Sequence, residues 1–218
     1  MTNNSQASWA GAPLSQNRLV QGLLAWYLLF WLWMAISPVD RSDWLLENIL
    51  AVTAVAALFL TARRFQFSNR SYVLITLFLT VHAIGAHYTY AKVPFGFWLQ
   101  DLLHAGRNPF DRLVHFAYGL LLAYPIREVL VRLAGVSGAW SYVLPVSATL
   151  AQSGLFELIE AVAATVVNPE LGAAYLGMQG DEWDAQKDMA AALTGAVLMM
   201  SATVAVSKWG AVRVPAAP

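Results

Sequence analysis

Long apolar segments alternate with short polar ones along most of this chain. A helix needs about 20 mostly apolar residues to cross the roughly 30 Å hydrocarbon core of a bilayer. Six segments meet this requirement: Leu19–Ser37, Trp44–Thr61, Ser71–Ala91, Phe110–Val131, Trp140–Val167 and Asp184–Ser207. The pattern predicts an all-α fold, a polytopic membrane helix bundle with six transmembrane helices.

Composition supports a membrane protein and excludes other classes. The chain is 58% hydrophobic with a mean hydropathy of +0.53, whereas soluble domains are roughly 45 to 50% apolar. It carries 13 basic and 13 acidic residues with no clustered basic face, which argues against a nucleic-acid partner. Because cysteine is absent, disulfides and thiolate metal ligands are ruled out.

The two ends of the chain differ in composition from its middle. Residues 1–17 are rich in Ser, Asn, Gln and Ala and lack a basic residue before Arg18, which predicts a disordered tail rather than a secretory signal. Residues 18–208 are expected to form a single transmembrane domain, and residues 209–218 a C-terminal tail.

Basic residues near the helix ends predict the orientation, because Lys and Arg are retained on the cytoplasmic side. They gather before the first segment, between the second and third, after the fourth and after the sixth: Arg18, Arg63, Arg64, Arg70, Arg127, Arg132, Lys208 and Arg213. Both termini are therefore expected to be cytoplasmic. On the opposite side, residues 93–107 are apolar and aromatic but too short to span, which predicts an interfacial or re-entrant segment.

Ionisable residues inside membrane helices are costly and are functional-site candidates by default. Helical rise places eight of them at one depth, in the outer half of four predicted helices. They are His82, His87, Asp111, His115, Glu157, Glu160, Asp184 and Asp188. We expect these side chains to form a polar chamber below the outer surface.

Spacing on each helix indicates which side chains share a face, since positions i, i+3 and i+4 align. Asp111 and His115 form one stripe. Glu157 and Glu160 form another, continued inward by Ser153 and Thr149. Asp184 and Asp188 continue into Ala191, Ala192 and Gly195, small residues suited to close helix packing. His82 and His87 are about 140° apart, so both face the chamber only if the helix bends, for example at Gly85.

Imidazole and carboxylate ligands on neighbouring helices are typical of metal sites in helical bundles. The eight residues are therefore candidate ligands for a divalent metal, either zinc, iron or manganese. Glu157, Glu160 and Asp188 are the candidate catalytic residues, because they lie too deep to cap a helix.

Several of the acids also have local explanations. Asn108 as N-cap with Pro109 at the first helical position would explain Asp111 by its helix-dipole position. Lys187 would neutralise Asp184 or Asp188 by local pairing. Glu47 is interpreted as a helix-end acid, and Asp101 and His104 as solvated loop residues.

Three functions remain open from the residues alone. The first is a metal-dependent membrane enzyme, such as a hydrolase of a lipid or envelope substrate near the outer leaflet. The second is a proton- or ion-coupled transporter, because intramembrane acids and histidines also serve as proton relays. The third is a non-catalytic bundle. The expected partners are the lipid bilayer and a lipid or small-molecule substrate.

Four motifs in order resemble the YjdF-like family of uncharacterised bacterial inner-membrane proteins, a domain of unknown function. They are HAIGAHYTYAKVP at residues 82–94, RNPFDRLVHF at 107–116, FELIE at 156–160 and G-x-QGDEWDAQKDM at 177–189. The resemblance implies a multi-pass protein of the bacterial inner (cytoplasmic) membrane. It assigns no catalytic role to any residue.

Overall fold

The computed structural model describes residues 16–167, 169–176 and 179–212, in which all regular secondary structure is helical. Eight helices follow one another in these residues: α1 (Arg18–Met34), α2 (Arg41–Thr61), α3 (Asn69–His87), α4 (Pro94–Leu103), α5 (Phe110–Arg132), α6 (Trp140–Val166), α7 (Pro169–Leu176) and α8 (Asp184–Val212). The predicted all-α class is confirmed for this part of the chain. The predicted tails fall largely on residues 1–15 and 213–218, which lie outside the described residues.

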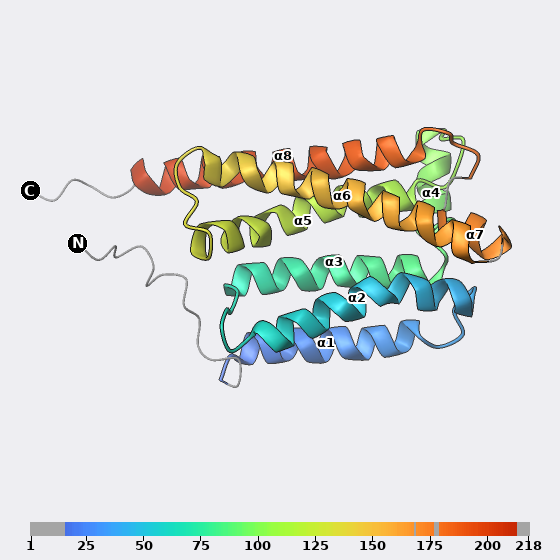
Figure 1. Ribbon diagram of the computed structural model, residues 1–218, viewed down its shortest axis with the longest axis horizontal. Helices are drawn as coiled ribbons and strands as arrows, with labels where there is room; N and C mark the ends of the chain where they lie inside the picture. Colours follow the sequence, from blue (N-terminus) through green and yellow to red (C-terminus); the bar gives the residue numbers. More distant parts are fainter. Residues whose placement is uncertain (1–15, 168, 177–178, 213–218) are drawn as a thin grey trace, which may run out of the picture.

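The six long helices run back and forth along one axis (Figure 1). Helices α1, α2 and α3 form one group and α5, α6 and α8 form the other. Contacts between α3 and α5 join the two groups, with a smaller contact between α2 and α7. Because α5 and α8 begin at the same end, they run parallel, whereas α1 begins and α8 ends at the opposite end (Figure 1).

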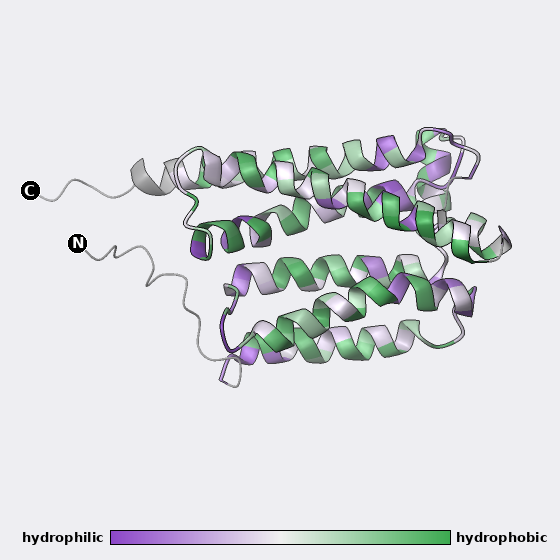
Figure 2. Ribbon diagram, viewed as in Figure 1, coloured by the Kyte–Doolittle hydropathy of each residue, from purple (hydrophilic) through white to green (hydrophobic). Residues whose placement is uncertain are grey.

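Four helices of the described chain are long and apolar enough to cross a membrane. They are α2, α5, α6 and α8, the last over Asp184–Ser207. Helix α1 is apolar but has only 17 residues, and α3 has 19 residues and is not among the four. Figure 2 shows hydrophobic residues along the middle of the long helices, with hydrophilic residues mainly toward their ends. The coarse prediction of several apolar helices in a membrane protein therefore agrees with the structure.

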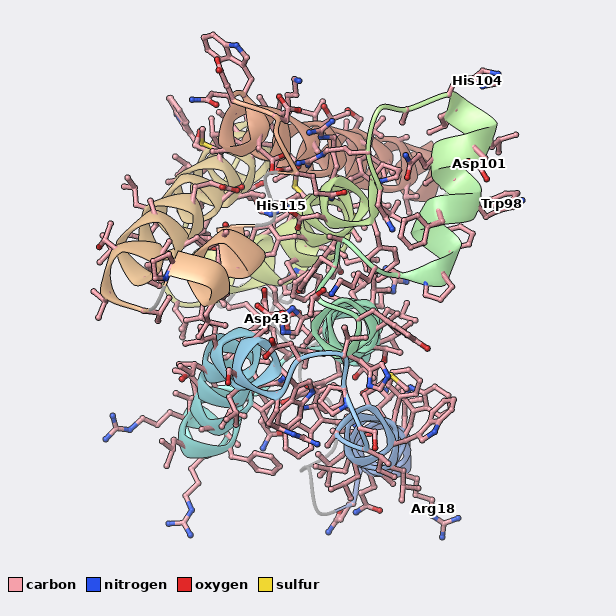
Figure 3. The ribbon with its side chains drawn as sticks, turned by 90° about the vertical axis from the view of Figure 1, so that its right-hand side faces the viewer. Arg18, Asp43, Trp98, Asp101, His104 and His115 are labelled. Carbon is pink, nitrogen blue, oxygen red and sulfur yellow. The ribbon has the colours of Figure 1, made fainter. Side chains whose placement is uncertain are left out.

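Helix α4 corresponds to the short apolar segment predicted between the third and fourth long helices. It is ten residues long and lies across the direction of the long helices in both Figure 1 and Figure 3. Phe95, Phe97 and Trp98 are each about half exposed. An apolar helix that lies across the bundle axis at one end suits the interface of a membrane better than its interior.

Helices α5 and α8 approach closely because small residues line their contact. A Cβ atom added to Gly119 of α5 would overlap the carbonyl oxygen of Ala192 on α8. A Cβ atom on Gly195 would overlap the carbonyl oxygen of Phe116. Ala192 is also fully buried. The predicted packing role of Ala192 and Gly195 is confirmed, and its partner surface on α5 is now identified.

A buried carboxylate fastens α3 to α5 at the other end of the bundle. Glu128 has no exposed surface and accepts hydrogen bonds from Ser68 N at 2.7 Å, Ser68 Oγ at 2.8 Å and Ser71 Oγ at 2.5 Å. Arg132 Nη1 lies 2.5 Å from the same carboxylate and 2.7 Å from the carbonyl oxygen of Gln66. This network satisfies the charge of Glu128, so the residue has a structural explanation.

The close contact between α5 and α8 predicts a strong effect of a single methyl group. We expect Gly119→Ala to destabilise the protein by about 1 to 3 kcal/mol, because the backbones must separate to admit it. Gly22→Ala is the matched control, since a Cβ atom there meets nothing within 4 Å. The thermal unfolding midpoint in detergent should fall for Gly119→Ala and stay equal or rise for Gly22→Ala. Equal midpoints for the two variants would contradict the close packing.

Candidate functional site

The parallel helices α5 and α8 bring three potential metal ligands together. The ligating atoms of Asp111, His115 and Asp188 all lie within 4.8 Å of one another. His115 and Asp188 are buried, and Asp111 is partly buried. In the described residues, no other three His, Cys, Asp or Glu side chains come this close.

Helix α6 adds a fourth group beside His115. His115 Nε2 lies 3.7 Å from Asp111 Oδ1 and 3.6 Å from Glu157 Oε1. Both distances are longer than a normal hydrogen bond. Glu157 Oε1 is buried and has no hydrogen-bond partner among the described atoms. Glu160, one turn further along α6, is also buried and hydrogen bonds the Glu157 side chain.

Two arginines neutralise the acids at the start of α8. Arg107 forms a bidentate ion pair with Asp184, in which Nη1 lies 2.7 Å from Oδ2 and Nη2 contacts Oδ1. Arg112 Nη2 lies 3.1 Å from Asp184 Oδ1, and its Nε lies 3.4 Å from Asp188 Oδ1. Asp184 is therefore held by two guanidinium groups and is less available as a ligand than Asp188.

The ion-pair partner of Lys187 differs from the one predicted from the sequence. Lys187 pairs with Asp181, at 2.7 Å between Nζ and Oδ2, and not with Asp184 or Asp188 as its helical spacing predicted. The chain turns before α8, which places the Asp181 carboxylate beside Lys187. Hydrogen bonds from Lys187 lower the pKa of the Asp181 carboxyl to about 2. Asp181 therefore stays ionised and also attracts Arg112, 3.3 Å away.

A second set of polar residues faces this group from α2 and α3. Asp43 is 1% exposed, and neither of its carboxylate oxygens has a hydrogen-bond partner in the described structure. Glu47, one turn later, is 5% exposed. The N-terminus of α2 is already capped by Asp40, which accepts from the backbone N–H groups of Ser42 and Asp43. Glu47 is buried, and capping does not explain it.

Tyr90 connects the two sets of residues. Its hydroxyl lies 2.5 Å from His82 Nδ1 and hydrogen bonds Glu47. The carboxylates of Asp111 and Glu160 also act electrostatically on it. Viewed from this end of the bundle, Asp43 and His115 both lie toward its middle (Figure 3). The acids of α2, α5 and α6 thus belong to one cluster of polar side chains, which is called the polar chamber below.

An unusual turn after α3 places the Tyr90 side chain beside His82 and Glu47. Thr89 and Tyr90 both have positive φ, 53° and 49°, a left-handed conformation that costs about 1 to 2 kcal/mol per non-glycine residue. The turn folds the Tyr90 ring back over Gly85, where a Cβ atom would lie 2.5 Å from the ring. Backbone strain of this kind is common at functional sites.

Tyr175 of α7 closes the chamber from another side. It is 6% exposed, and burial raises the pKa of its hydroxyl. The nearby carboxylates of Glu47, Glu160 and Asp43 raise that pKa further. Tyr175 therefore remains protonated and can donate a hydrogen bond to a carboxylate or to a bound molecule.

The remaining candidates lie elsewhere or have local roles. His87 points away from the chamber, with Nδ1 2.8 Å from the carbonyl oxygen of Met34, so His82 is the histidine of α3 that faces it. Asp101 and His104 are exposed on and after α4, as expected (Figure 3). Asn108 Oδ1 accepts from Phe110 N, and α5 begins at Phe110, so Pro109 lies just before the helix instead of at its first position. Asp111 lies in the first turn of α5, where the helix dipole also favours its charge.

Sequence reasoning missed several residues of the chamber. Glu47 was interpreted as a helix-end acid, Tyr90 falls within the predicted segment Ser71–Ala91, and Asp43, Arg107 and Arg112 were not among the candidates. The available signal was the pairing of Asp43 and Glu47 at spacing i, i+4 behind an N-cap of their own, Asp40. The ion pair of Arg107 with Asp184 joins residues 77 positions apart, which no local pattern indicates.

Comparison with known proteins agrees with the membrane assignment. Residues 19–209 match a family described as "Predicted membrane protein (DUF2238)". The chain is 42% identical to the inner membrane protein YjdF of Escherichia coli (strain K12) over 170 residues, which cover 78% of this chain and 81% of that protein. No solved structure matches the chain. These matches confirm the resemblance carried by the four motifs.

The buried ion pair between Arg107 and Asp184 predicts a non-additive response to mutation. Arg107→Leu should destabilise the protein by about 3 to 5 kcal/mol, because it leaves a buried charge without its main partner. The double variant Arg107→Leu with Asp184→Leu should be more stable than either single variant. Thermal unfolding midpoints of the four proteins test this, and additive losses would show that the pair is not coupled.

Proposed function

The chain belongs to the DUF2238 family of predicted membrane proteins, and from that premise we propose that it is a metal-dependent enzyme of the bacterial inner membrane. The chamber at one end of the bundle is its active site. Zinc, iron or manganese is the metal class that suits a ligand set of one imidazole and several carboxylates.

The spacing around His115 is the observation that carries this proposal. Two ligands of a tetrahedral ion, each about 2.1 Å from it, lie about 3.4 Å apart. His115 Nε2 is 3.7 Å from Asp111 Oδ1 and 3.6 Å from Glu157 Oε1, close to that separation and too far for hydrogen bonding. Asp188 brings a further carboxylate within 4.8 Å of Asp111 and His115. A shared cation accounts for the close grouping of Asp111, His115 and Asp188, and Glu157 beside His115 is a further candidate ligand.

The acids of the chamber differ in their number of arginine partners. Asp184 is paired with both Arg107 and Arg112, and Asp188 only with Arg112, at 3.4 Å, whereas Asp111 and Glu157 have no such contact among the described ion pairs. Uncompensated buried carboxylates are costly unless they bind a proton or a cation. We therefore assign Asp111, His115, Glu157 and Asp188 as ligands, with Asp184 as a support that orients Arg112.

Residues around the metal would carry the remaining chemistry. A bound divalent ion supplies Lewis acidity and lowers the pKa of a water molecule. Glu160 is buried and hydrogen bonds Glu157, which places it to accept and return a proton. Tyr90 and Tyr175 supply hydroxyl donors on the opposite wall. The reaction class that fits is hydrolysis of a lipid or envelope substrate at the outer leaflet.

The proposed membrane orientation places the chamber toward the outer surface. All six long helices cross the membrane, including α1 and α3, and both termini are cytoplasmic. Support comes from the basic residues, which gather at the end where α1 begins and α8 ends. Helix α4 then lies in the outer interface beside the chamber (Figure 3).

A second candidate function, proton- or ion-coupled transport, is favoured by one feature of α6. Ser141, Thr149, Ser153 and Glu160 are all buried, so the face that carries the acids stays polar along much of the helix. Thr149 Oγ1 donates to the Pro145 carbonyl at 2.8 Å. The next buried hydroxyl, that of Ser141, lies about 12 Å further along the helix, so no buried hydroxyl of α6 lies between these two residues. Proton flux in proteoliposomes that persists after metal removal would support transport. A bundle without either activity is the third candidate.

Metal content tests the proposed site directly. We expect purified protein to hold about one equivalent of a transition metal. His115→Ala and Asp188→Asn should each lower metal affinity at least about tenfold, because each removes a ligand. His104→Ala is the matched control, since His104 is exposed after α4. The measurement is elemental analysis of tag-free protein, and a metal-free wild type or equal loss in the control would refute the assignment.

A further inference from the structure

A groove lies at the opposite end of the molecule from the chamber. It has a volume of about 690 Å³ and lies between α1 and α3 on one side and α5, α6 and α8 on the other. Its walls are mainly apolar, with Val73 and Leu74 from α3 facing Met199 and Val206 from α8. The two groups of helices are joined through α3 and α5, and the described residues of α8 make no comparable contact with α1 or α3.

Two arginines, Arg70 and Arg127, line this groove, and none of the described residues that line it is acidic. Arg70 is exposed in the first turn of α3. Arg127 lies near the end of α5, with its guanidinium carbon 4.5 Å from the centre of the Tyr142 ring and Nη2 3.4 Å from Ser141 Oγ. The Nε atom of Arg127 is buried without a hydrogen-bond partner in the described structure. Stacking on Tyr142 fixes the guanidinium and leaves donors for another group.

Arg70 and Arg127 differ from the three arginines that form ion pairs within the described helices and loops. Arg132 is neutralised by Glu128, and Arg107 and Arg112 by the acids of α8. The ion pairs formed among the described residues include neither Arg70 nor Arg127. Two positive charges without a carboxylate partner, at one end of an apolar groove, are complementary to an anionic amphiphile.

The membrane supplies such a molecule at this location. Helices α5, α6 and α8 are long and apolar enough to cross a bilayer. We therefore expect the groove that they form with α3 to open toward the lipid chains of that bilayer. Water is a poor occupant of apolar space of this kind, and an acyl chain is a good one. The arginines lie near the helix ends, where phospholipid phosphates are found.

We propose that this groove is a binding site for one anionic phospholipid from the leaflet at the arginine-rich end. One acyl chain lies between Val73 of α3 and Met199 of α8, and the phosphate is bound by Arg70 and Arg127. The lipid thereby fills the space between the two groups of helices. The site is separate from the proposed metal site, and neither proposal depends on the other.

The test compares lipids that differ only in headgroup charge. Protein in detergent is mixed with palmitoyl-oleoyl phosphatidylglycerol or with the matching phosphatidylethanolamine, and bound lipid is measured by native mass spectrometry. We expect one phosphatidylglycerol to bind in preference to phosphatidylethanolamine. The double variant Arg70→Ala with Arg127→Ala should bind it about 30-fold more weakly, since each surface cation contributes a few-fold to anionic lipid binding.

Matched variants separate the groove from general surface charge. Arg63→Ala with Arg64→Ala removes two exposed arginines at the same end that do not line the groove, and should retain the lipid. Arg70→Ala alone, which leaves the packing of Arg127 on Tyr142 intact, should weaken binding about fivefold. Ala202→Trp fills the groove from α8 without changing charge, and should abolish binding of the lipid.

Three results would overturn the proposal. Equal binding of the two lipids would show that the arginines do not select an anionic headgroup. An equal loss in the Arg63 and Arg64 double variant would assign the effect to surface charge. Retained phosphatidylglycerol in a folded Ala202→Trp protein would place the lipid elsewhere. Circular dichroism of each variant checks that the helices are formed.

Discussion

The close approach of α5 and α8 is the constraint on which the chamber depends. The two helices are parallel, and Gly119 and Gly195 allow their backbones to touch where any larger side chain would separate them. This contact fixes their relative register, so that each turn of α5 meets the corresponding turn of α8. One turn before Gly119 along α5, His115 comes beside Asp188, and Arg112 reaches both Asp184 and Asp188. A glycine contact without polar groups thus determines the geometry of the polar site.

Charge balance then divides the acids into two kinds. Asp181 and Asp184 have Lys187, Arg107 and Arg112 as partners, and Glu128 has Arg132 with two serines at the other end of the bundle. These acids have structural explanations. The same chamber holds five further carboxylates, and the ion pairs among the described residues give them fewer cationic partners than there are carboxylates. They are Asp111, Glu157, Glu160, Asp43 and Glu47. This excess of carboxylates, more than the hydrophobic packing, is what a functional account of the protein must explain.

Much of the architecture follows from the sequence, because helical periodicity and hydrocarbon thickness restrict apolar segments strongly. The pairs Asp111 with His115 and Glu157 with Glu160 could be placed on common faces by spacing alone. The ion pairs were harder, since Arg107 reaches Asp184 across 77 positions and Lys187 pairs through a turn instead of along a helix. Tyr90 could not be predicted, because its position depends on a left-handed turn at non-glycine residues. Glu47 was interpreted as a helix-end acid, but Asp40 caps α2 and the Glu47 side chain is buried.

We propose that His115 and the carboxylates around it on α5, α6 and α8 share one cation. X-ray absorption spectroscopy at the edge of the metal in the purified protein tests this sharing. We expect nearest ligands of nitrogen and oxygen only, at about 2.0 to 2.2 Å, with the outer-shell scattering of one imidazole that disappears in His115→Ala. A shell of water oxygens without imidazole scattering, unchanged in that variant, would contradict it.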